Sequence, residues 1–588
     1  MKLRIPFKVA GITALLLVVG GAAWAIVGVG QLPGSVQPGP VSNALTPERP
    51  ESSEAAPSIT EPTQQAAQPL GEQAKKIKFQ LNKIVLKGNH VYTDQQLSLL
   101  YQDKLHKVIS IADLMDIAVS ITNYYRNTGY IISRAILPPQ HVKNGVVEIQ
   151  IIEGYLDKVT VGGHPKGAKC IVMAYGQQII KCRPLKIDRM EHYLFLANEL
   201  PGTQVKAVLV PSKTEPGAAD LTLITENRPV TGYLSYDNYG TRYIGPQQMT
   251  ANLGLNSFAS AGDTTQVTVV RTPKGGELNF TDINYTLPIS DEGVTWLMGA
   301  TRVHTHPLFV LQPSQVDGLN DNYYTNFQFP IIRERDQRLT WQAGFFYVDS
   351  IVNQLDELFY ADHIRSLDLG LIYNFADRWS GVNLIVADFR QGLPILGYTS
   401  NQNPDTAQTS RPGALGDYTK VTLLMNRLQA VKGPVSLYGV FKGQWAFNPV
   451  LSSEQFTFGG SQLGRGYDVA EVIGDKGLAG SVELRYDWNV SRFLIQTLQL
   501  YTFYDAGMMW DYKQIPGTPS HQSATSFGVG TRFSLNKYIS GNVMWAQPLT
   551  KPVAAEQATS SIIINGLTYY TASGMAPRVF FSIVASLD

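Results

Sequence analysis

Apolar and polar positions alternate with a period of two along the C-terminal part of the chain. From Pro229 onward, segments of about ten residues show this alternation, and clusters of Gly, Pro, Asn, Asp and Ser separate them. Residues 482–488 place Val, Leu, Tyr and Trp on one face and Glu, Arg and Asp on the other, and residues 527–535 alternate in the same way. We therefore predict β-strands, about 16 in number, at roughly 22 residues for each strand with its loop.

Charged and aromatic residues in these strands favour a membrane barrel over a soluble β-sandwich, which also alternates. The polar faces carry charge and the apolar faces end in aromatic residues, as expected for a polar lumen and an interfacial aromatic girdle. Strands that span a membrane must close, because an open edge would leave backbone groups unpaired in lipid. The sequence thus predicts a transmembrane β-barrel of about 16 antiparallel strands over residues 228–588.

Two α+β modules precede the predicted barrel. Residues 76–154 have the order strand, two helices and two strands, and a capping-box pattern at Thr93 and at Ser110 marks the start of each helix. Residues 155–227 repeat this βααββ order, with Pro-Gly pairs at the turns. Two tandem copies of one topology indicate a duplicated module.

An export signal begins the chain. Three basic residues up to Lys8 precede an apolar run, and Ala23 and Ala25 place small residues at the two positions that determine cleavage. This pattern predicts a signal peptide over residues 1–25. The uncharged run continues to Gly30 and is also long enough for an uncleaved inner-membrane anchor. In both interpretations the rest of the chain leaves the cytoplasm.

A proline-rich segment joins the signal to the first module. Residues 26–75 contain eight prolines among Gly, Ser, Gln, Glu and Ala. Such a composition cannot bury a core, and each proline removes a backbone donor. We therefore expect a flexible or extended linker.

Composition fits a barrel and excludes several other classes of protein. The 588 residues carry a net charge of +1, only 16% are charged, and the mean hydropathy is −0.07, as expected where apolar and polar positions average out. This balance leaves no basic footprint for nucleic acid. The sequence also lacks a nucleotide-binding Gly-Lys-Ser/Thr loop. We expect no nucleic acid, nucleotide or cofactor.

The two cysteines exclude a disulfide scaffold and a four-thiolate zinc site. Cys170 and Cys182 could form one disulfide in an oxidising compartment, and the alternative is two free thiols in a small core. His304 and His306 could share a strand face, but two histidines without a third ligand do not indicate a metal site. We expect no metal.

A glycine-rich loop with a single arginine precedes the strand at residues 482–488. Residues 456–468 read FTFGGSQLGRGYD, with the arginine at position 465. An arginine among glycines is usually solvated. The alternation of residues 498–508, however, points Asp505 into the lumen. A loop folded into the barrel would therefore give Asp505 an opposite charge, and a bidentate pair with Arg465 would lock the loop.

Taken together, these motifs resemble the two-partner secretion transporters, which export haemolysins and filamentous haemagglutinins and belong to the outer-membrane assembly superfamily. The resemblance covers about residues 77–588 and includes Gly88-Asn89, Leu200-Pro201-Gly202 and Asp237-Asn238-Tyr239-Gly240. It implies that residues 76–154 and 155–227 are periplasmic POTRA domains and that the barrel lies in the bacterial outer membrane. Some members plug the pore with an N-terminal helix, and the proline-rich linker argues against a long one here.

The resemblance also implies roles for residues in the loop. The tip with Arg465, Gly466 and Tyr467 is expected to fold back into the lumen, where Arg465 pairs with Asp505 on the barrel wall. The implied function is not enzymatic. The protein would secrete one large partner exoprotein, an adhesin, a haemolysin or a contact-dependent toxin, from the periplasm to the cell surface.

The resemblance implies partners as well. The exoprotein would carry an N-terminal secretion domain and would meet the POTRA domains first. An exposed edge around Ile131, Ile132, Ser133 and Arg134 could accept a strand by β-augmentation, although ordinary sheet pairing explains the same residues. Outer-membrane lipid would surround the barrel, and the barrel assembly machinery would insert it.

Two other functions remain open from the sequence. One is an assembly or insertion factor for other outer-membrane proteins, which shares the loop motif but has a longer array of modules. The other is a passive porin or nutrient receptor, which leaves the two modules and the Arg465 loop unexplained.

Overall fold

The structure is a computed structural model that describes most of the chain after residue 31. The described residues are 32–45, 59–60, 73–215, 217–273, 276–400, 408–488, 490, 495–512, 520–559, 561–564, 567–570 and 573–587. The predicted signal peptide, residues 1–25, lies outside them. Within these ranges no helix has the length and apolar content needed to span a membrane.

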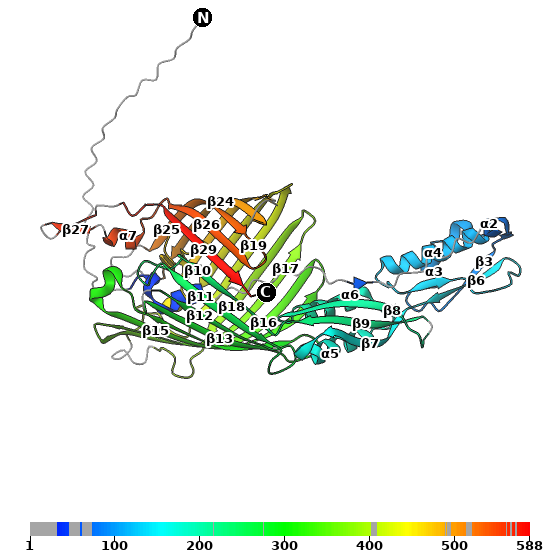
Figure 1. Cartoon of the computed structure of the whole chain (residues 1–588), viewed down its shortest axis with the longest axis horizontal. Helices are drawn as coiled ribbons and strands as arrows, with labels where there is room; N and C mark the ends of the chain where they lie inside the picture. The colour runs from blue at the N-terminus through cyan, green and yellow to red at the C-terminus, as the bar shows by residue number, and fades with distance from the viewer. Residues whose placement is uncertain are drawn as a thin grey trace, which may run out of the picture.

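Sixteen strands of the described chain close into one antiparallel barrel, in which each strand pairs with the next and the last pairs with the first (Figure 1). The strands are β10 (Val230–Asp237), β11 (Gln248–Asn256), β12 (Thr264–Arg271), β13 (Leu278–Pro288), β14 (Thr295–Thr305), β15 (Val316–Arg333), β16 (Gln337–Gln354), β17 (Glu357–Ala376), β18 (Gly381–Gly392), β19 (Thr419–Lys432), β20 (Val435–Ala446), β23 (Lys476–Trp488), β24 (Thr497–Trp510), β25 (His521–Ser534), β26 (Ile539–Pro548) and β29 (Arg578–Ser586). The predicted fold class is confirmed.

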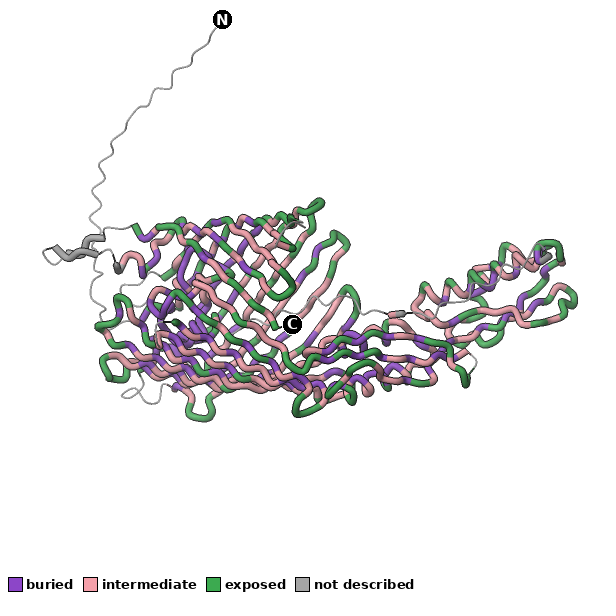
Figure 2. Tube along the Cα trace, viewed as in Figure 1, coloured by how far each residue is buried: buried purple, intermediate pink, exposed green. Residues whose placement is uncertain are grey.

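The barrel wall follows the period of two that the sequence predicted. In β24, Tyr504 is 50% exposed on the outer face, whereas its neighbours Phe503 and Asp505 are 2% and 0% exposed. Figure 2 shows the same alternation of buried and exposed residues along the barrel strands. Apolar side chains therefore cover the outside, and polar and charged side chains point into the lumen.

The first module packs two helices against a small sheet. Its elements are α2 (Gln73–Lys76), β2 (Lys78–Gln80), β3 (Lys83–Lys87), α3 (Asp94–Ser98), η2 (Gln102–Lys104), β4 (Val108–Ser110), α4 (Ile111–Asn127), β5 (Arg134–Ile136) and β6 (Val146–Ile152). The sheet order is β3-β6-β5, and β2 pairs separately with β4. Thr93 and Ser110 form the two capping boxes that begin α3 and α4.

The second module repeats the βααββ order. Its elements are β7 (Tyr155–His164), η3 (Lys166–Ala168), α5 (Lys169–Ile180), α6 (Ile187–Asn198), β8 (Thr203–Pro211) and β9 (Ala218–Asn227). A two-residue strand of the linker, β1 (Ile59–Thr60), pairs in parallel with β8 and extends the sheet to β1-β8-β9-β7.

The second module is joined to one end of the barrel, which we call the module end (Figure 1). Helix α6 faces the turns between β13 and β14 and between β15 and β16. Glu199 of α6's C-terminus forms an ion pair of 2.8 Å with the buried Arg333, and Tyr193 donates a hydrogen bond of 2.9 Å to Glu292. Strand β10 begins at this end, directly after the module, so that these turns all lie on the module side.

Loops at the opposite end, which we call the far end, carry short elements. These are η4 (Phe309–Ser314), α7 (Ala554–Thr559), β27 (Ser561–Ile564) and β28 (Leu567–Tyr570).

The expectation that residues 26–75 form only a flexible or extended linker is wrong for their first described part. Residues 34–36 form η1 (Gly34–Val36), and residues 38–45 form α1 (Pro38–Leu45), both buried inside the barrel near its far end. Pro38 and Pro40 stand in the first turn of α1, where backbone N–H groups have no partner within the helix, so that they permit the helix. Leu32, Val36 and Val41 are buried against apolar side chains of the wall.

Of the two alternatives for Cys170 and Cys182, the structure has the free thiols and not the disulfide. Cys170 lies in the first turn of α5 and Cys182 lies just after its last residue. The ten helical steps from Cys170 to Ile180 alone span about 15 Å, and a disulfide needs the two Cα atoms within about 7 Å of each other.

The proposed edge at Ile131, Ile132, Ser133 and Arg134 is only partly a strand. Arg134 begins β5, which pairs on one side with β6 and is an edge of its sheet. Ile131 and Ile132 instead pack against the core of the second module, and Ser133 is buried and accepts a hydrogen bond from the N–H of Gly154. The residues before Arg134 thus join the two modules and are not a free edge, because their apolar side chains find a core to pack against.

Candidate gating site in the barrel lumen

One long connection folds into the barrel. Residues 447–475, which we call the lumen loop, link β20 to β23 and fold back into the lumen. They contain η5 (Ser452–Glu454), β21 (Phe456–Phe458) and β22 (Val472–Gly474). Strands β21 and β22 pair with each other, so that the loop is a hairpin whose tip carries residues 459–471.

Glycines shape the tip of the lumen loop. Gly459 has a φ of +117°, and a Cβ atom there would lie 2.0 Å from the carbonyl oxygen of Asp468. Gly466 lies against the wall, where a Cβ atom would approach the backbone N of Pro548 to 2.8 Å. A side chain at either position would push the tip apart or away from the wall.

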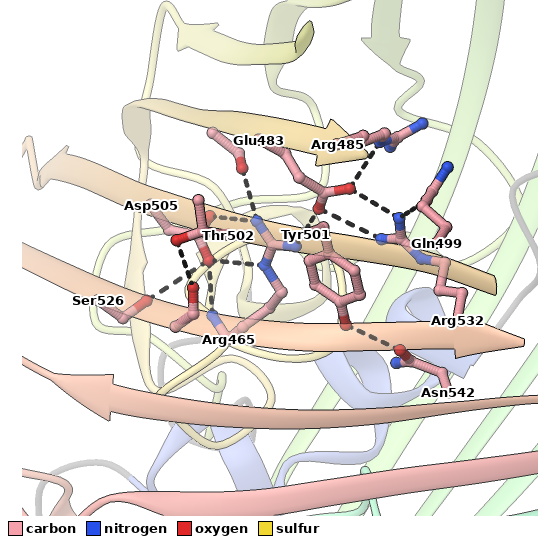
Figure 3. A network of polar contacts seen from close by, with 12 residues as sticks. Arg465, Glu483, Arg485, Gln499, Tyr501, Thr502, Asp505, Ser526, Arg532 and Asn542 are labelled. Carbon is pink, nitrogen blue, oxygen red and sulfur yellow. Dashed lines mark hydrogen bonds and ion pairs between the residues drawn. The ribbon is translucent and has the colours of Figure 1, made fainter. Parts of the chain in front are cut away.

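The structure brings Arg465 and Asp505 together (Figure 3). Nε and Nη2 of Arg465 donate to the two carboxylate oxygens of Asp505 over 3.1 and 2.8 Å, and the backbone N–H of Arg465 also donates to Asp505 over 2.9 Å. The guanidinium lies 3.5 Å from the ring centroid of Phe503. The pair is therefore bidentate, buried and stacked on an aromatic ring.

Glu483 on β23 is a second carboxylate at the tip, which the sequence did not single out. It accepts a hydrogen bond of 2.6 Å from Nη1 of Arg465 and bonds of 2.7 Å from Arg485 and Arg532 (Figure 3). Glu483 is 2% exposed. Three arginines thus surround two buried carboxylates. Arg465 is itself buried, whereas the side chains of Arg485 and Arg532 are 17% and 37% exposed. Removing Glu483 would leave three cations close together without the carboxylate that they share.

Tyr467 completes the contacts of the tip with the wall. Its ring is 1% exposed and packs near Phe458 of the same loop. Its hydroxyl donates to the carbonyl of Thr525 over 3.0 Å and accepts from the N–H of Lys551 over 3.2 Å. Arg465, Gly466 and Tyr467 therefore all contact the wall.

Further ion pairs, which no sequence pattern predicted, hold other parts of the lumen loop. Glu454 of η5 lies 2.7 Å from Nζ of Lys420. Asp475 pairs with Arg411, and Asp468 pairs with Arg578. None of these loop carboxylates stands in a periodic pattern. The one sequence feature that could have indicated these ion pairs is the recurrence of acidic residues through a loop between two barrel strands.

A cavity of about 1320 Å³ remains in the lumen beside the loop and α1. Charged wall residues, the lumen loop and Asn43 of α1 line it, and at the module end Leu200 and Pro201 of the second module line it too. The second module thus borders the same space as the loop.

The described residues contain no group of three or more metal-ligating side chains. His304 and His306 both face Asp317, at 2.9 and 3.5 Å. The expectations of no metal and no cofactor stay predictions.

A closed 16-strand barrel, two βααββ modules and a lumen loop held to the wall through Arg-Gly-Tyr define a POTRA-barrel transporter of the outer membrane. The ShlB-type POTRA domain family matches residues 79–154. The family of haemolysin secretion/activation proteins ShlB/FhaC/HecB matches residues 220–533, which is more than half of the chain. The chain belongs to this ShlB/FhaC/HecB family.

Curated relatives and solved structures agree with this assignment. The heme/hemopexin transporter protein HuxB of Haemophilus influenzae (strain 86-028NP) is 23% identical over 507 residues, which cover 84% of this chain and 88% of HuxB. The outer membrane transporter CdiB of Dickeya dadantii is 21% identical over 487 residues, or 81% of this chain and 83% of CdiB. The structure of CdiB from Escherichia coli has the same fold, with a TM-score of 0.66, 18% identity and coverage of 95% of this chain and 94% of CdiB.

These findings confirm the predicted family, function class and location. The protein is an outer-membrane transporter that secretes a partner exoprotein by two-partner secretion, with its POTRA domains in the periplasm. The module end of the barrel is therefore periplasmic, and the far end is extracellular. The family consists of transporters, in keeping with a function that is not enzymatic.

Proposed function

We propose that the lumen loop and α1 close the channel at rest and that the partner exoprotein displaces them during export. The observation that carries this proposal is the buried set of bonds from Arg465 to Asp505 and Glu483. These bonds hold the tip of the loop across the path between the two ends of the barrel. The wall-bound loop is the state from which export begins.

The periplasmic side of the path follows from the lining of the cavity. The exoprotein arrives unfolded, carries an N-terminal secretion domain and meets the POTRA domains first. From the second POTRA domain it passes Leu200 and Pro201 into the lumen, because these residues belong to that domain and line the lumen cavity. Lumen side chains are polar, so that an extended chain keeps hydrogen-bonding partners while it crosses.

The first contact of the exoprotein is an edge strand. Strand β5, which begins at Arg134, has one unpaired side and is short, as natural sheet edges often are. An extended segment of the exoprotein adds to this edge by β-augmentation. Ile131, Ile132 and Ser133 take part only by fixing the angle between the two domains.

No nucleotide, nucleic acid or enzymatic step enters this mechanism. Net movement comes from folding of the exoprotein outside the cell. The other partners are outer-membrane lipid, against which the apolar outer face packs, and the barrel assembly machinery, which inserts the protein itself. The exported partner is a large adhesin, haemolysin or contact-dependent toxin.

Deletion of this protein tests the proposed function against assembly of other barrels. We expect one exoprotein to disappear from the cell surface and medium while the other outer-membrane proteins keep their levels. Mass spectrometry of outer-membrane and secreted fractions gives both quantities. A general loss of outer-membrane proteins would instead identify an assembly factor, and unchanged secretion would exclude export.

A further inference from the structure

We propose that Glu454 is a second positioning residue of the gate. It fixes the base of the lumen loop, η5, to the wall, and η5 in turn supports α1. This support, which we call the seat of α1, does not depend on Arg465. This inference rests on the proposed function of the loop and α1 as the closure of the channel, and it adds a residue that controls α1.

Glu454 is held by other strands of the wall than Arg465 is. Its carboxylate lies 2.7 Å from Nζ of Lys420 on β19 and 3.4 Å from Nη1 of Arg390 on β18. Its backbone carbonyl accepts hydrogen bonds of 2.9 Å from Lys420 and from Gln444 on β20. Arg390 is in turn paired with Asp368 on β17 at 2.7 Å.

The charges of this cluster balance, and three of its four members are buried, whereas the side chain of Arg390 is 25% exposed. Glu454 is 4% exposed and Lys420 is 7% exposed. Two cations, Lys420 and Arg390, face two carboxylates, Glu454 and Asp368. Only Glu454 comes from the loop, so that its carboxylate supplies the loop's charge in this cluster, beside the two bonds to its backbone carbonyl. Without it, Lys420 would be a buried cation beside Arg390.

Helix α1 lies directly on the residue before Glu454. Asn43 of α1 donates a hydrogen bond of 2.7 Å to the carbonyl oxygen of Ser453. A Cβ atom at Gly39 would lie 2.6 Å from Cβ of Ser453, so that only glycine permits this approach. The position of Ser453 therefore decides whether α1 fits.

The other side of α1 rests on the wall. Thr305 at the end of β14 donates to the carbonyl oxygen of Val36 over 3.4 Å. A Cβ atom at Gly318 on β15 would lie 3.1 Å from Pro38. Across the lumen the order is thus wall, α1, η5 and wall. If η5 leaves the wall at Glu454, α1 loses one of the two surfaces that clamp it.

The Arg465 contacts do not provide this seat. Asp505 stands on β24, three strands beyond β19 in the order of the barrel. The two anchors therefore hold different parts of the loop on different strands. Release of the tip leaves η5 bound to Lys420, and release of Glu454 leaves the tip bound to Asp505.

Glu454→Gln in the full-length protein tests the proposal. The substitution keeps the shape of the side chain and removes its charge. The matched control is Asp388→Asn, because Asp388 is a carboxylate on the wall of the same cavity that bonds to Gln342 and Thr422 and not to the loop. Conductance of the purified protein in planar lipid bilayers is the first measurement.

Accessibility of α1 is the second measurement. Val41 is 2% exposed, so Val41→Cys, with Cys170 and Cys182 replaced by Ser, reports release of α1 through reaction with a membrane-impermeant maleimide added to intact cells. We expect Glu454→Gln to raise both the conductance and the labelling rate at least about tenfold, because loss of one member of a buried ion pair is strongly destabilising. Asp388→Asn should label like the parent, and Arg465→Gln should raise labelling less than Glu454→Gln does.

Folding of the barrel is checked by its heat-dependent mobility on gels. If Glu454→Gln does not fold, Lys420→Gln removes the opposite charge of the same pair and is expected to have the same two effects. A folded Glu454→Gln with the conductance and labelling of the parent would overturn the proposal. Release of α1 by Glu454→Gln, together with unchanged secretion after deletion of the whole protein, would contradict the proposed function. It would still support the role of Glu454 in holding α1.

Discussion

Arg465 of the lumen loop and Asp505 of β24 are joined by three hydrogen bonds, two from the guanidinium and one from the backbone N–H of Arg465. The backbone bond fixes the main chain of the tip as well as its side chain. A lysine could replace the charge but not the planar fork that binds both carboxylate oxygens. The carboxylate of Asp505 therefore fixes the resting position of the loop tip on the wall.

Asp505→Asn should raise the conductance of the protein in planar lipid bilayers. The amide keeps the shape but loses charged hydrogen bonds worth about 1.5–3 kcal/mol each, so the conducting state should gain about tenfold or more in population. Ser526→Ala is the matched control, since Ser526 reaches the same carboxylate only through a long bond of 3.4 Å. Equal conductance of the two variants would argue against the pair as a lock.

Glu483→Gln should destabilise the barrel more than Arg485→Gln does. Glu483 accepts hydrogen bonds from three arginines. Among the described residues, the one carboxylate that Arg485 contacts is Glu483. Losing Glu483 removes charged hydrogen bonds from three arginines that lie close together and should cost about 1.5–3 kcal/mol, and losing Arg485 should cost less than that. The temperature at which the barrel loses its fast mobility on gels measures the difference. The reverse order would show that Glu483 is not the centre of the cluster.

The two thiols should react fully without a reducing agent. Cys170 and Cys182 lie at opposite ends of α5, too far apart to bridge. Mass spectrometry after denaturation and alkylation should find two modified cysteines in protein purified from the outer membrane. Recovery of an unmodified pair that reacts only after reduction would contradict the structure here.

The barrel and the inward direction of Asp505 could be predicted because alternation along a strand is a local property. The pairing of Asp505 with Arg465 is not local, since the two residues are 40 positions apart. The strand phase and the charges made the pair possible, and the resemblance to a family made it an expectation. Helix α1 was missed because its prolines read as a linker, and the wall and lumen loop that bury it are distant in sequence. Glu454 was missed for the same reason, because nothing around it marks a partner such as Lys420.

The joint between the second POTRA domain and the barrel should depend on Glu199 more than on Glu191. Glu199 pairs with Arg333, whose side chain is 9% exposed, and Glu191 pairs with Arg335, whose side chain is 64% exposed. Glu199→Ala should cost about 1.5–3 kcal/mol, and Glu191→Ala less than about 1 kcal/mol.

Limited proteolysis between the second POTRA domain and the barrel measures this loosening of the joint. We expect faster cleavage in Glu199→Ala and the rate of the parent in Glu191→Ala. Equal rates would mean that the packing of α6, and not the buried ion pair, holds the domain.

Secretion by the Arg465→Glu variant tests the central claim most directly. The reversed charge would face Asp505 and Glu483 in a buried site, so the tip could not bind the wall, and the state from which export begins would be lost. With the barrel shown to be folded and at parental level in the outer membrane, we predict that the partner exoprotein in the medium falls at least about tenfold. Secretion equal to that of the parent would contradict the account.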